Sequence, residues 1–413
     1  MSLTKATFSM INGASANVLD FGADPTGVAD STTAIQSALD SGASDIYIPA
    51  GVYLFSTLTV NGNTRIHGAN GRTSVLKHTG AGIAIDCVYT ATPPDGRGNY
   101  IESGWFIFED FELMANGSVG FSVGNTRSTF TQWHNIYMRH RRDLEAGDSN
   151  NQYFPDSTAI NCDNTPWAST DATYFTQINH CFMRGFENAV NLKAIVNAWQ
   201  INQLYTIECK NHVVLNQTTG ITMSDCYFES GVAAAQGVVF GSDGGNKISI
   251  LNTSFELTNV AATQYAYNFT AGGSWETVTV AGAKYLIEGD GNAVNSKRIT
   301  GTAPVSFVEL NRTYLSSIYG QIPMLWAPGC SASKPFQAPN YSRFGGFQQG
   351  TGQIFLGRND TDAESIIFTT GVGSPEGVVT APVGSIYTDF VGGTGTVLYI
   401  KETGASNTGW VAK

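Results

Sequence analysis

Two glutamates in matching local contexts are the strongest candidates for chemistry in this sequence. Glu229 ends the run Cys226-Tyr-Phe-Glu229, and Glu256 ends the run Ser254-Phe-Glu256. Hydrolysis of a glycosidic bond usually needs two carboxyl groups: one protonates the leaving oxygen, and the other acts as nucleophile or activates water. The pair therefore predicts a glycan-cleaving site if the fold brings both side chains together. The alternative is that both glutamates belong to a polar ladder or to a subunit contact.

Asp225 is a third candidate, four positions before Glu229 in the sequence. It is either a carboxylate of the site or a turn residue, because an Asp side chain readily bonds to its own neighbouring backbone. Asp163 and Glu208 are weaker alternatives. The predicted substrate-binding residues, which combine aromatic rings with one cation, are Arg184, Trp199, Tyr205, Tyr227 and Trp275. The aromatic residues have a second interpretation, as core or subunit interface.

A different reaction, β-elimination on a uronic-acid polymer, would need a base, a proton donor and a cation. The residues of these types that fall within eight positions of each other are His134, Tyr137, Arg139, His140 and Arg141. The alternative is a basic loop with one core histidine.

A degenerate repeat between residues 105 and 260 predicts how these side chains are positioned. Each unit is a polar turn pair followed by an apolar–aromatic–apolar step, as in Asn202-Gln-Leu-Tyr-Thr206. The units recur at intervals of 22 to 28 residues, apart from one interval of 45 that separates His134 from Asn179. A fixed period in this range is the signature of a solenoid. We expect the long interval to hold two coils, with Ser157–Cys162 supplying part of the second.

Alternation within each unit assigns the side chains to faces. Cys226 and Phe228 are expected inside, and Tyr227 and Glu229 outside. Stacking the units gives one outward column of Tyr137, Phe182, Tyr205 and Tyr227, and a second of Arg139, Arg184 and Glu229, which Glu256 joins if its Phe-Glu pair aligns with Phe228-Glu229. Adjacent strands lie ~4.8 Å apart, so the aligned glutamates would approach the ~5 Å carboxyl spacing of retaining glycosidases.

The N-terminal part predicts a capping unit. Asn17–Ala23 is expected to form a short strand, and Thr32–Asp40 a helix whose N-cap is Asp30 or Ser31. Asp45–Tyr53 follows as strand, turn and strand.

Both ends of the chain resemble phage proteins. The run Asn17-Val-Leu-Asp-Phe-Gly-Ala-Asp-Pro-Thr-Gly-Val-Ala-Asp-Ser31, with the helix and strands after it, resembles the N-terminal module of the pectate-lyase-like β-helices of phage tailspikes. In that family the helix covers apolar core and unpaired strand edge that the first coil would expose. The segment from Val379 to Trp410 resembles the C-terminal ends of phage tail fibres and spikes.

The resemblance implies an all-β fold, a right-handed parallel β-helix built as a single-stranded solenoid. We expect a short leader (1–16), the β-helix (17–300, with its N-terminal cap at 17–60) and a C-terminal β-rich region for trimerisation or carbohydrate contact (301–413).

The implied function is that of a homotrimeric phage tailspike that depolymerises a bacterial surface polysaccharide (capsule, O-antigen or exopolysaccharide), most simply as an endo-glycosidase. It would be made in the host cytoplasm and lie in the virion tail beside other tail or baseplate proteins. A polysaccharide lyase and a non-catalytic receptor-binding tail protein are the alternatives. A free-standing pectin-degrading enzyme is disfavoured, because the N-terminus lacks the apolar run of a signal peptide.

Composition excludes several classes of protein. The net charge of −11 argues against a nucleic-acid partner, which would need a basic surface. No run of 18 apolar residues predicts a membrane span. None of the six cysteines forms a CxxC pair, so we expect buried thiols and neither a metal site nor a redox dithiol. Phosphate-cradle and HExxH motifs are missing too, and we predict no cofactor.

Overall fold

The computed structural model describes residues 14–88, 105–123, 130–140, 152–163, 173–258, 264–270, 273–287, 299–301, 305–310, 354–357 and 365–413. The chain divides into two compact units, Met1–Gln321 and Ile322–Lys413. Each is described by itself.

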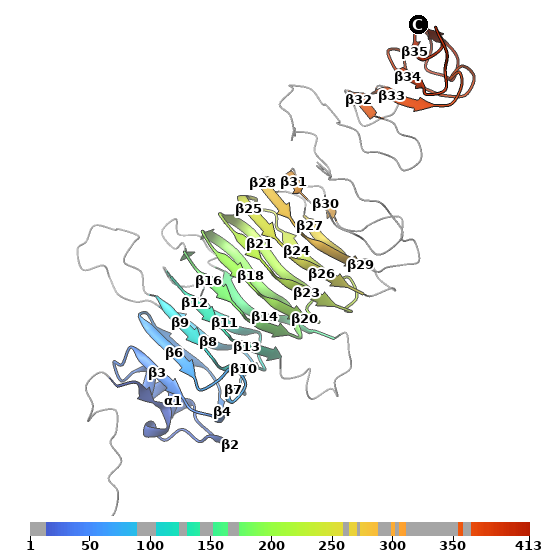
Figure 1. Cartoon of the computed structure of the whole chain (residues 1–413). Helices are drawn as coiled ribbons and strands as arrows, with labels where there is room; N and C mark the ends of the chain where they lie inside the picture. The colour runs from blue at the N-terminus through green and yellow to red at the C-terminus, as the bar shows by residue number, and fades with distance from the viewer. Residues whose placement is uncertain are drawn as a thin grey trace, which may run out of the picture. The chain divides into compact units, whose positions relative to one another are not determined.

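The first unit is a right-handed parallel β-helix, as predicted, with three strands in a typical coil (Figure 1). Its strands form two parallel sheets, sheet A with two rows and sheet B with one. The first row of sheet A contains β1 (Ala16–Asn17), β3 (Asp45–Ile48), β6 (Thr64–Gly68), β9 (Phe106–Glu109), β12 (Gln132–His134), β16 (Gln177–Asn179), β19 (Gln200–Asn202), β22 (Thr222–Ser224), β25 (Gly245–Leu251), β28 (Trp275–Ala281) and β31 (Val305–Leu310).

The second row of sheet A contains β5 (Leu58–Asn61), β8 (Ile83–Val88), β11 (Val119–Ser122), β14 (Phe154–Asp163), β18 (Phe186–Asn197), β21 (Asn211–Thr219), β24 (Gln236–Phe240), β27 (Tyr265–Phe269) and β30 (Ile299–Gly301), and β15 (Thr173–Tyr174) pairs with β18. Sheet B contains β2 (Thr26–Asp30), β4 (Gly51–Phe55), β7 (Ser74–His78), β10 (Glu112–Ala115), β13 (Tyr137–His140), β17 (Phe182–Arg184), β20 (Tyr205–Ile207), β23 (Tyr227–Ser230), β26 (Ser254–Leu257) and β29 (Lys284–Ile287).

The solenoid continues past residue 300, which was its predicted end. β30 pairs with β27 and β31 pairs with β28, both in parallel.

A left-handed corner residue sets the register between sheet A and sheet B. The residues at this corner, which all have φ between 49° and 58°, are Asp110, Asn135, His180, Gln203, Asp225 and Asn252. Side chains beside the corner bond between coils: Asn202 Nδ2 donates to Asn179 Oδ1 at 2.9 Å, and Ser224 Oγ donates to Asn202 Oδ1 at 2.6 Å. The polar turn pair of the repeat is this corner, and its repetition keeps the following strands in line.

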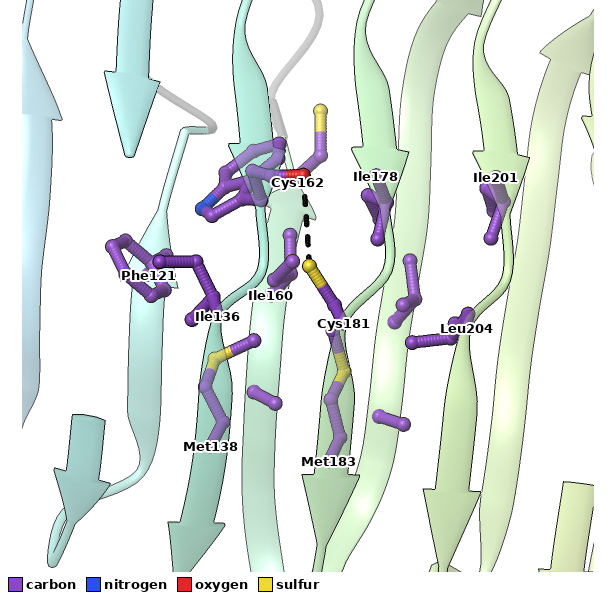
Figure 2. Packing of buried hydrophobic residues seen from close by; sticks show 14 of the residues in the cluster. Phe121, Ile136, Met138, Ile160, Cys162, Ile178, Cys181, Met183, Ile201 and Leu204 are labelled. Carbon is purple, nitrogen blue, oxygen red and sulfur yellow. Dashed lines mark hydrogen bonds between the residues drawn. The ribbon is translucent and has the colours of Figure 1, made fainter. Parts of the chain in front are cut away.

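The interior is filled by the apolar positions that follow each corner. Ile136, Cys181 and Leu204 form one row, and Met138 and Met183 lie in the next (Figure 2). Cys181 donates from sulfur to the Trp133 carbonyl at 3.5 Å, and burial raises the pKa of its thiol to about 12. The cysteines that are free and buried, as predicted, are Cys87, Cys162, Cys181, Cys209 and Cys226; Cys330 lies outside the described residues.

The interval of 45 residues is one coil, which corrects the prediction of two. Tyr137 of β13 pairs directly with Phe182 of β17, so no strand of sheet B lies between them. Ser157–Cys162 lies in β14, the sheet A strand of this same coil. A solenoid admits long loops at a corner because loop-closure entropy grows slowly with loop length.

The N-terminal cap follows the prediction in its helix. α1 (Thr32–Leu39) buries Ile35, Ala38 and Leu39, and Asp30 Oδ1 accepts the Thr32 amide at 2.9 Å. The segment predicted as a strand differs: only β1 is extended, and a 3₁₀ turn, η2 (Val18–Phe21), follows it. Asp24 organises the next loop by accepting the Ala29 and Thr26 amides, which lowers its pKa to about 2.

The described part of the second unit contains a small mixed sheet, sheet C. Its strands are β32 (Ile354–Gly357), β33 (Ser365–Gly371), β34 (Ile386–Asp389), β35 (Leu398–Lys401) and β36 (Trp410–Ala412). Tyr387, Tyr399 and Trp410 form its core with Ile367 and Ala381. The β-rich character expected of the C-terminal region is therefore present in its described strands.

Candidate functional site

The outer surface of sheet B carries the two predicted columns in register. Tyr137, Phe182, Tyr205 and Tyr227 are consecutive partners on neighbouring strands, and they form the aromatic column. The second column runs through Arg139, Arg184, Ile207, Glu229 and Glu256. The side chains between them, such as Met183 and Phe228, point into the core. We call the two columns together the strip.

The rings of the aromatic column contact one another along the solenoid axis. Tyr137 and Phe182 stack with centroids 4.2 Å apart and planes 1° from parallel. Tyr205 is turned by 90° from Phe182 and by 89° from Tyr227. The N-terminal half of the column is therefore a face-to-face stack, and Tyr205 is oriented differently from its neighbours.

The carboxylates of the strip lie on adjacent strands at the same register position. Glu229 of β23 pairs with Glu256 of β26. Tyr205 Oη donates to Glu229 Oε2 at 2.5 Å, and Tyr227 Oη makes the equivalent bond to Glu256 Oε2. Each glutamate is thus held by the tyrosine of the preceding coil. Strands in a sheet are separated by ~4.8 Å, which sets the scale of the distance between the carboxylates.

These contacts keep the phenols protonated. The hydrogen bond to Glu256, together with burial, raises the pKa of Tyr227 to about 12. Burial and the bond to Glu229 raise the pKa of Tyr205 further. A phenol with so high a pKa is a poor proton donor to a substrate, so the tyrosines can position the carboxylates but do not replace them as acids.

Each arginine of the strip is ion-paired with a buried glutamate. Arg139 Nε donates to Glu112 Oε1 at 2.8 Å, and Arg184 Nε donates to Glu208 Oε2 at 2.9 Å. The glutamate side chains are only 3% and 7% exposed. Arg72 lies over the Tyr137 ring, with its guanidinium carbon 4.8 Å from the centroid.

Glu208 is closer to the site than its sequence suggested. It follows Ile207 at the end of β20 with φ of 53°, and its amide bonds the Glu229 carbonyl at 3.0 Å. The feature that brings Glu208 beside the site is its positive φ, and the sequence gives no sign of that backbone conformation. Asp225 has the turn geometry that was one of its two interpretations: it is exposed at the corner between β22 and β23, at the edge of the strip.

The tryptophans belong to the core. Trp199 is 0% exposed and Trp275 is 1% exposed. Trp199 lies 6.2 Å from Trp133, and Trp275 Nε1 donates to the Gly241 carbonyl at 3.0 Å. This burial corrects the prediction that Trp199 and Trp275 contact substrate, because neither ring reaches the surface.

The residues proposed for β-elimination do not form one site. His140 is fully buried and stacks on Phe154 at 4.4 Å, which is the core-histidine interpretation. His134 lies on β12, across the corner from Tyr137 and Arg139 on β13. Arg141 lies outside the described residues.

Over the described part of the chain, His, Cys, Asp and Glu side chains nowhere gather in a group of three that could hold a metal ion. The helix found there is too short to cross a membrane.

Comparisons with known proteins identify a sequence family and a set of similar folds. Residues 15–238 match the family described as rhamnogalacturonase A/epimerase, pectate lyase-like. No curated protein gives a significant match.

Three solved phage proteins illustrate the similarity of fold. ORF18 of Geobacillus virus E2 is 15% identical over 94% of this chain and 84% of its own, with a TM-score of 0.48. The gp42 tailspike of Acinetobacter phage vb_AbaP_AS12 is 11% identical over 80% and 67%, with a TM-score of 0.45. The pre-mature gene product 12 of bacteriophage phi29 is 13% identical over 71% and 42%, with a TM-score of 0.46.

Proposed function

We propose that this chain, which belongs to the rhamnogalacturonase A/epimerase, pectate lyase-like family, binds a bacterial surface polysaccharide along the strip and hydrolyses it. The observation that supports this proposal is the register of Glu229 with Glu256 on adjacent strands, beside a column of aromatic rings. Polysaccharide-processing enzymes are known in this family of β-helices, and the carboxylates supply a chemistry that fits.

In the proposed mechanism one carboxyl group protonates the glycosidic oxygen as its bond to the anomeric carbon breaks, and the other attacks that carbon to form a glycosyl ester. Water, deprotonated by the first group, then hydrolyses the ester and frees the second carboxylate. Glu229 and Glu256 share a register position on adjacent strands, which lie ~4.8 Å apart, so we expect their carboxylates near the ~5 Å separation of retaining enzymes, which leaves no room for a water molecule between carboxylate and sugar. Tyr205 and Tyr227 fix the orientation of the carboxylates through their phenol groups. We therefore expect net retention of anomeric configuration.

The test is to mix the full chain with a panel of purified capsules and lipopolysaccharides and to measure new reducing ends. Release of reducing ends without the ultraviolet absorbance of an unsaturated sugar identifies hydrolysis, and absorbance identifies a lyase. Glu229→Gln and Glu256→Gln should each lower the rate at least about a hundredfold if the carboxylates are the acid and nucleophile. Asp225→Asn is the matched control and should keep most of the activity. Full activity in both glutamine variants would refute this site.

A non-catalytic receptor-binding protein is the second candidate. It is favoured by the fact that both glutamates already accept tyrosine hydrogen bonds, as members of a structural ladder would. Binding without any cleavage across the panel would select this candidate.

We also propose that the protein works as a homotrimer in a phage tail, in contact with other tail or baseplate proteins. The proposal is supported by the phage-like segments at both ends of the sequence. Light scattering on the purified chain should give three times the monomer mass, and a monomeric mass would refute the trimer.

A further inference from the structure

The charges of the strip are arranged so that its cations are neutralised and two of its anions are not. Arg139 and Arg184 each lie against a glutamate whose side chain is almost fully buried, Glu112 and Glu208. A carboxylate so deeply buried cannot turn away to water, so these arginines stay paired when a ligand approaches. They offer a sugar hydrogen-bond donors and little net positive charge.

Glu229 and Glu256 have no such compensation. Among the described residues, no lysine or arginine lies within ion-pair distance of either carboxylate, and both accept hydrogen bonds from neutral phenols. The nearest cation on this face outside the arginine–glutamate pairs is the exposed Lys284 of β29, which follows Tyr227 and Ser254 at the same register position and makes no ion pair with Glu256 among the described residues, so one lysine faces two carboxylates. The part of the strip around β23 and β26 is therefore negative.

A polyanionic glycan on this surface would meet repulsion at the carboxylates. The whole chain adds to it with a net charge of −11. One negative sugar substituent about 5 Å from a carboxylate weakens binding by on the order of tenfold, with the size set by local solvent screening. An uncharged glycan has no such penalty, and its C–H faces and hydroxyl groups suit the aromatic rings and the paired arginines.

We propose that the strip accepts an uncharged polysaccharide and excludes polyanionic ones, because Glu112 and Glu208 neutralise its arginines while Glu229 and Glu256 make no ion pair and outnumber the one lysine near them. This inference rests on the proposed function for the position of the glycan. It adds the class of substrate, and it assigns the two buried glutamates a role as specificity-determining residues.

The first experiment sorts the polysaccharide panel by the charge of the repeating unit. Binding and cleavage by the full chain are expected only for uncharged polymers, with an affinity that is insensitive to salt. Cleavage of an acidic polymer that stops when its carboxyl groups are reduced to alcohols would overturn the inference. A panel without any cleavage counts against the proposed function instead, and the second experiment then decides the inference.

The second experiment uses dextran sulfate as a polyanion probe and needs no substrate. The double variant Glu112→Gln/Glu208→Gln exposes the charges of Arg139 and Arg184 and should bind the probe about tenfold or more tightly than the unmodified protein at low salt. Melting curves establish that the variant is folded. Glu187→Gln is the matched control, since Glu187 belongs to β18 of sheet A and its loss releases Lys210 from a 2.8 Å ion pair that is not part of the strip.

Three outcomes are distinct. A gain in the double variant and none in Glu187→Gln supports the inference. An equal gain in both would show that overall charge alone governs binding, and tight binding by the unmodified protein that is lost in Arg139→Gln/Arg184→Gln would show that the arginines are already available. Either result would overturn it.

Discussion

We predict that this β-helix loses stability below neutral pH because of the buried His212. The side chain is 0% exposed inside the solenoid and stacks on Phe228, with ring centroids 5.2 Å apart. Nδ1 is hydrogen-bonded to Thr206 Oγ1, and no group lies within hydrogen-bond distance of the buried Nε2 in the described structure. Protonation would place a charge in the core without an acceptor for the second N–H group.

The size of the effect follows from the pKa. Burial lowers the pKa of His212 from 6.5 to about 3. Between pH 6.5 and 3, His212 is therefore protonated in the unfolded chain and neutral in the folded chain. The free energy of unfolding falls by about 1.4 kcal/mol for each pH unit of decrease in this range. Between pH 7 and 5 the loss from this residue is about 2 kcal/mol.

The assay compares the unmodified protein with Thr206→Val/His212→Leu, which replaces both hydrogen-bonding partners by apolar groups of similar volume. Urea unfolding at pH 7 and pH 5, followed by tryptophan fluorescence, gives the change in stability with pH. The double variant should lose about 2 kcal/mol less than the unmodified protein between these values. Replacement of the exposed His180 by Asn is the control and should leave the pH dependence as it is. Parallel pH dependences for the double variant and the unmodified protein would refute the reasoning.

Three further predictions concern the strip and the cap. Tyr227→Phe removes the phenol that orients Glu256 and should lower the rate of reducing-end release about tenfold with an unchanged circular dichroism spectrum, since a hydrogen bond to a charged group contributes about 1.5–3 kcal/mol; an unchanged rate would contradict the positioning role. Arg184→Met removes the cation that Glu208 contacts and should destabilise the protein by about 3 kcal/mol in urea unfolding, while adding Glu208→Gln should restore most of the loss. Gly51→Ala should lower the melting temperature, because φ is 153° and the new Cβ would lie 2.6 Å from Pro25 Cβ; an equal or higher melting temperature would show that the loop gives way.

Much of the fold could be predicted because the repeat carries two independent signals. The polar corner fixes where each strand of sheet B begins, and alternation after the corner fixes which side chains face out. Tyr227 and Glu229 were assigned to the outside on these grounds, and the structure places them there. The length of a coil was not predictable, because a corner accepts an insertion without disturbing the strands: Tyr137 and Phe182 stack although 45 positions separate them.

The site was predictable only where periodicity decides orientation. The register of Glu229 with Glu256 followed from the common Phe-Glu pair, and it is confirmed. Trp199 and Trp275 have aromatic side chains that suit both the core and contact with sugars. Their residue type therefore does not determine whether the rings face the interior or the outer surface of the solenoid. The contact of Glu208 with Arg184 depends on a left-handed backbone at a non-glycine residue, which local sequence does not specify.

The repeating left-handed corner has a consequence for how such proteins diversify. Each coil begins at an equivalent corner and advances the chain by one strand spacing. Equivalent residues therefore recur along the solenoid axis every ~4.8 Å. A duplicated or deleted coil shifts all later coils by one strand spacing, and pairs of residues that lie on the same side of the change keep their register. Loops inserted at other corners change the residues that border the strip without moving the residues of the strip itself. Changes in the loops can thus alter which polysaccharide is recognised while Glu229 and Glu256 keep their positions along the axis.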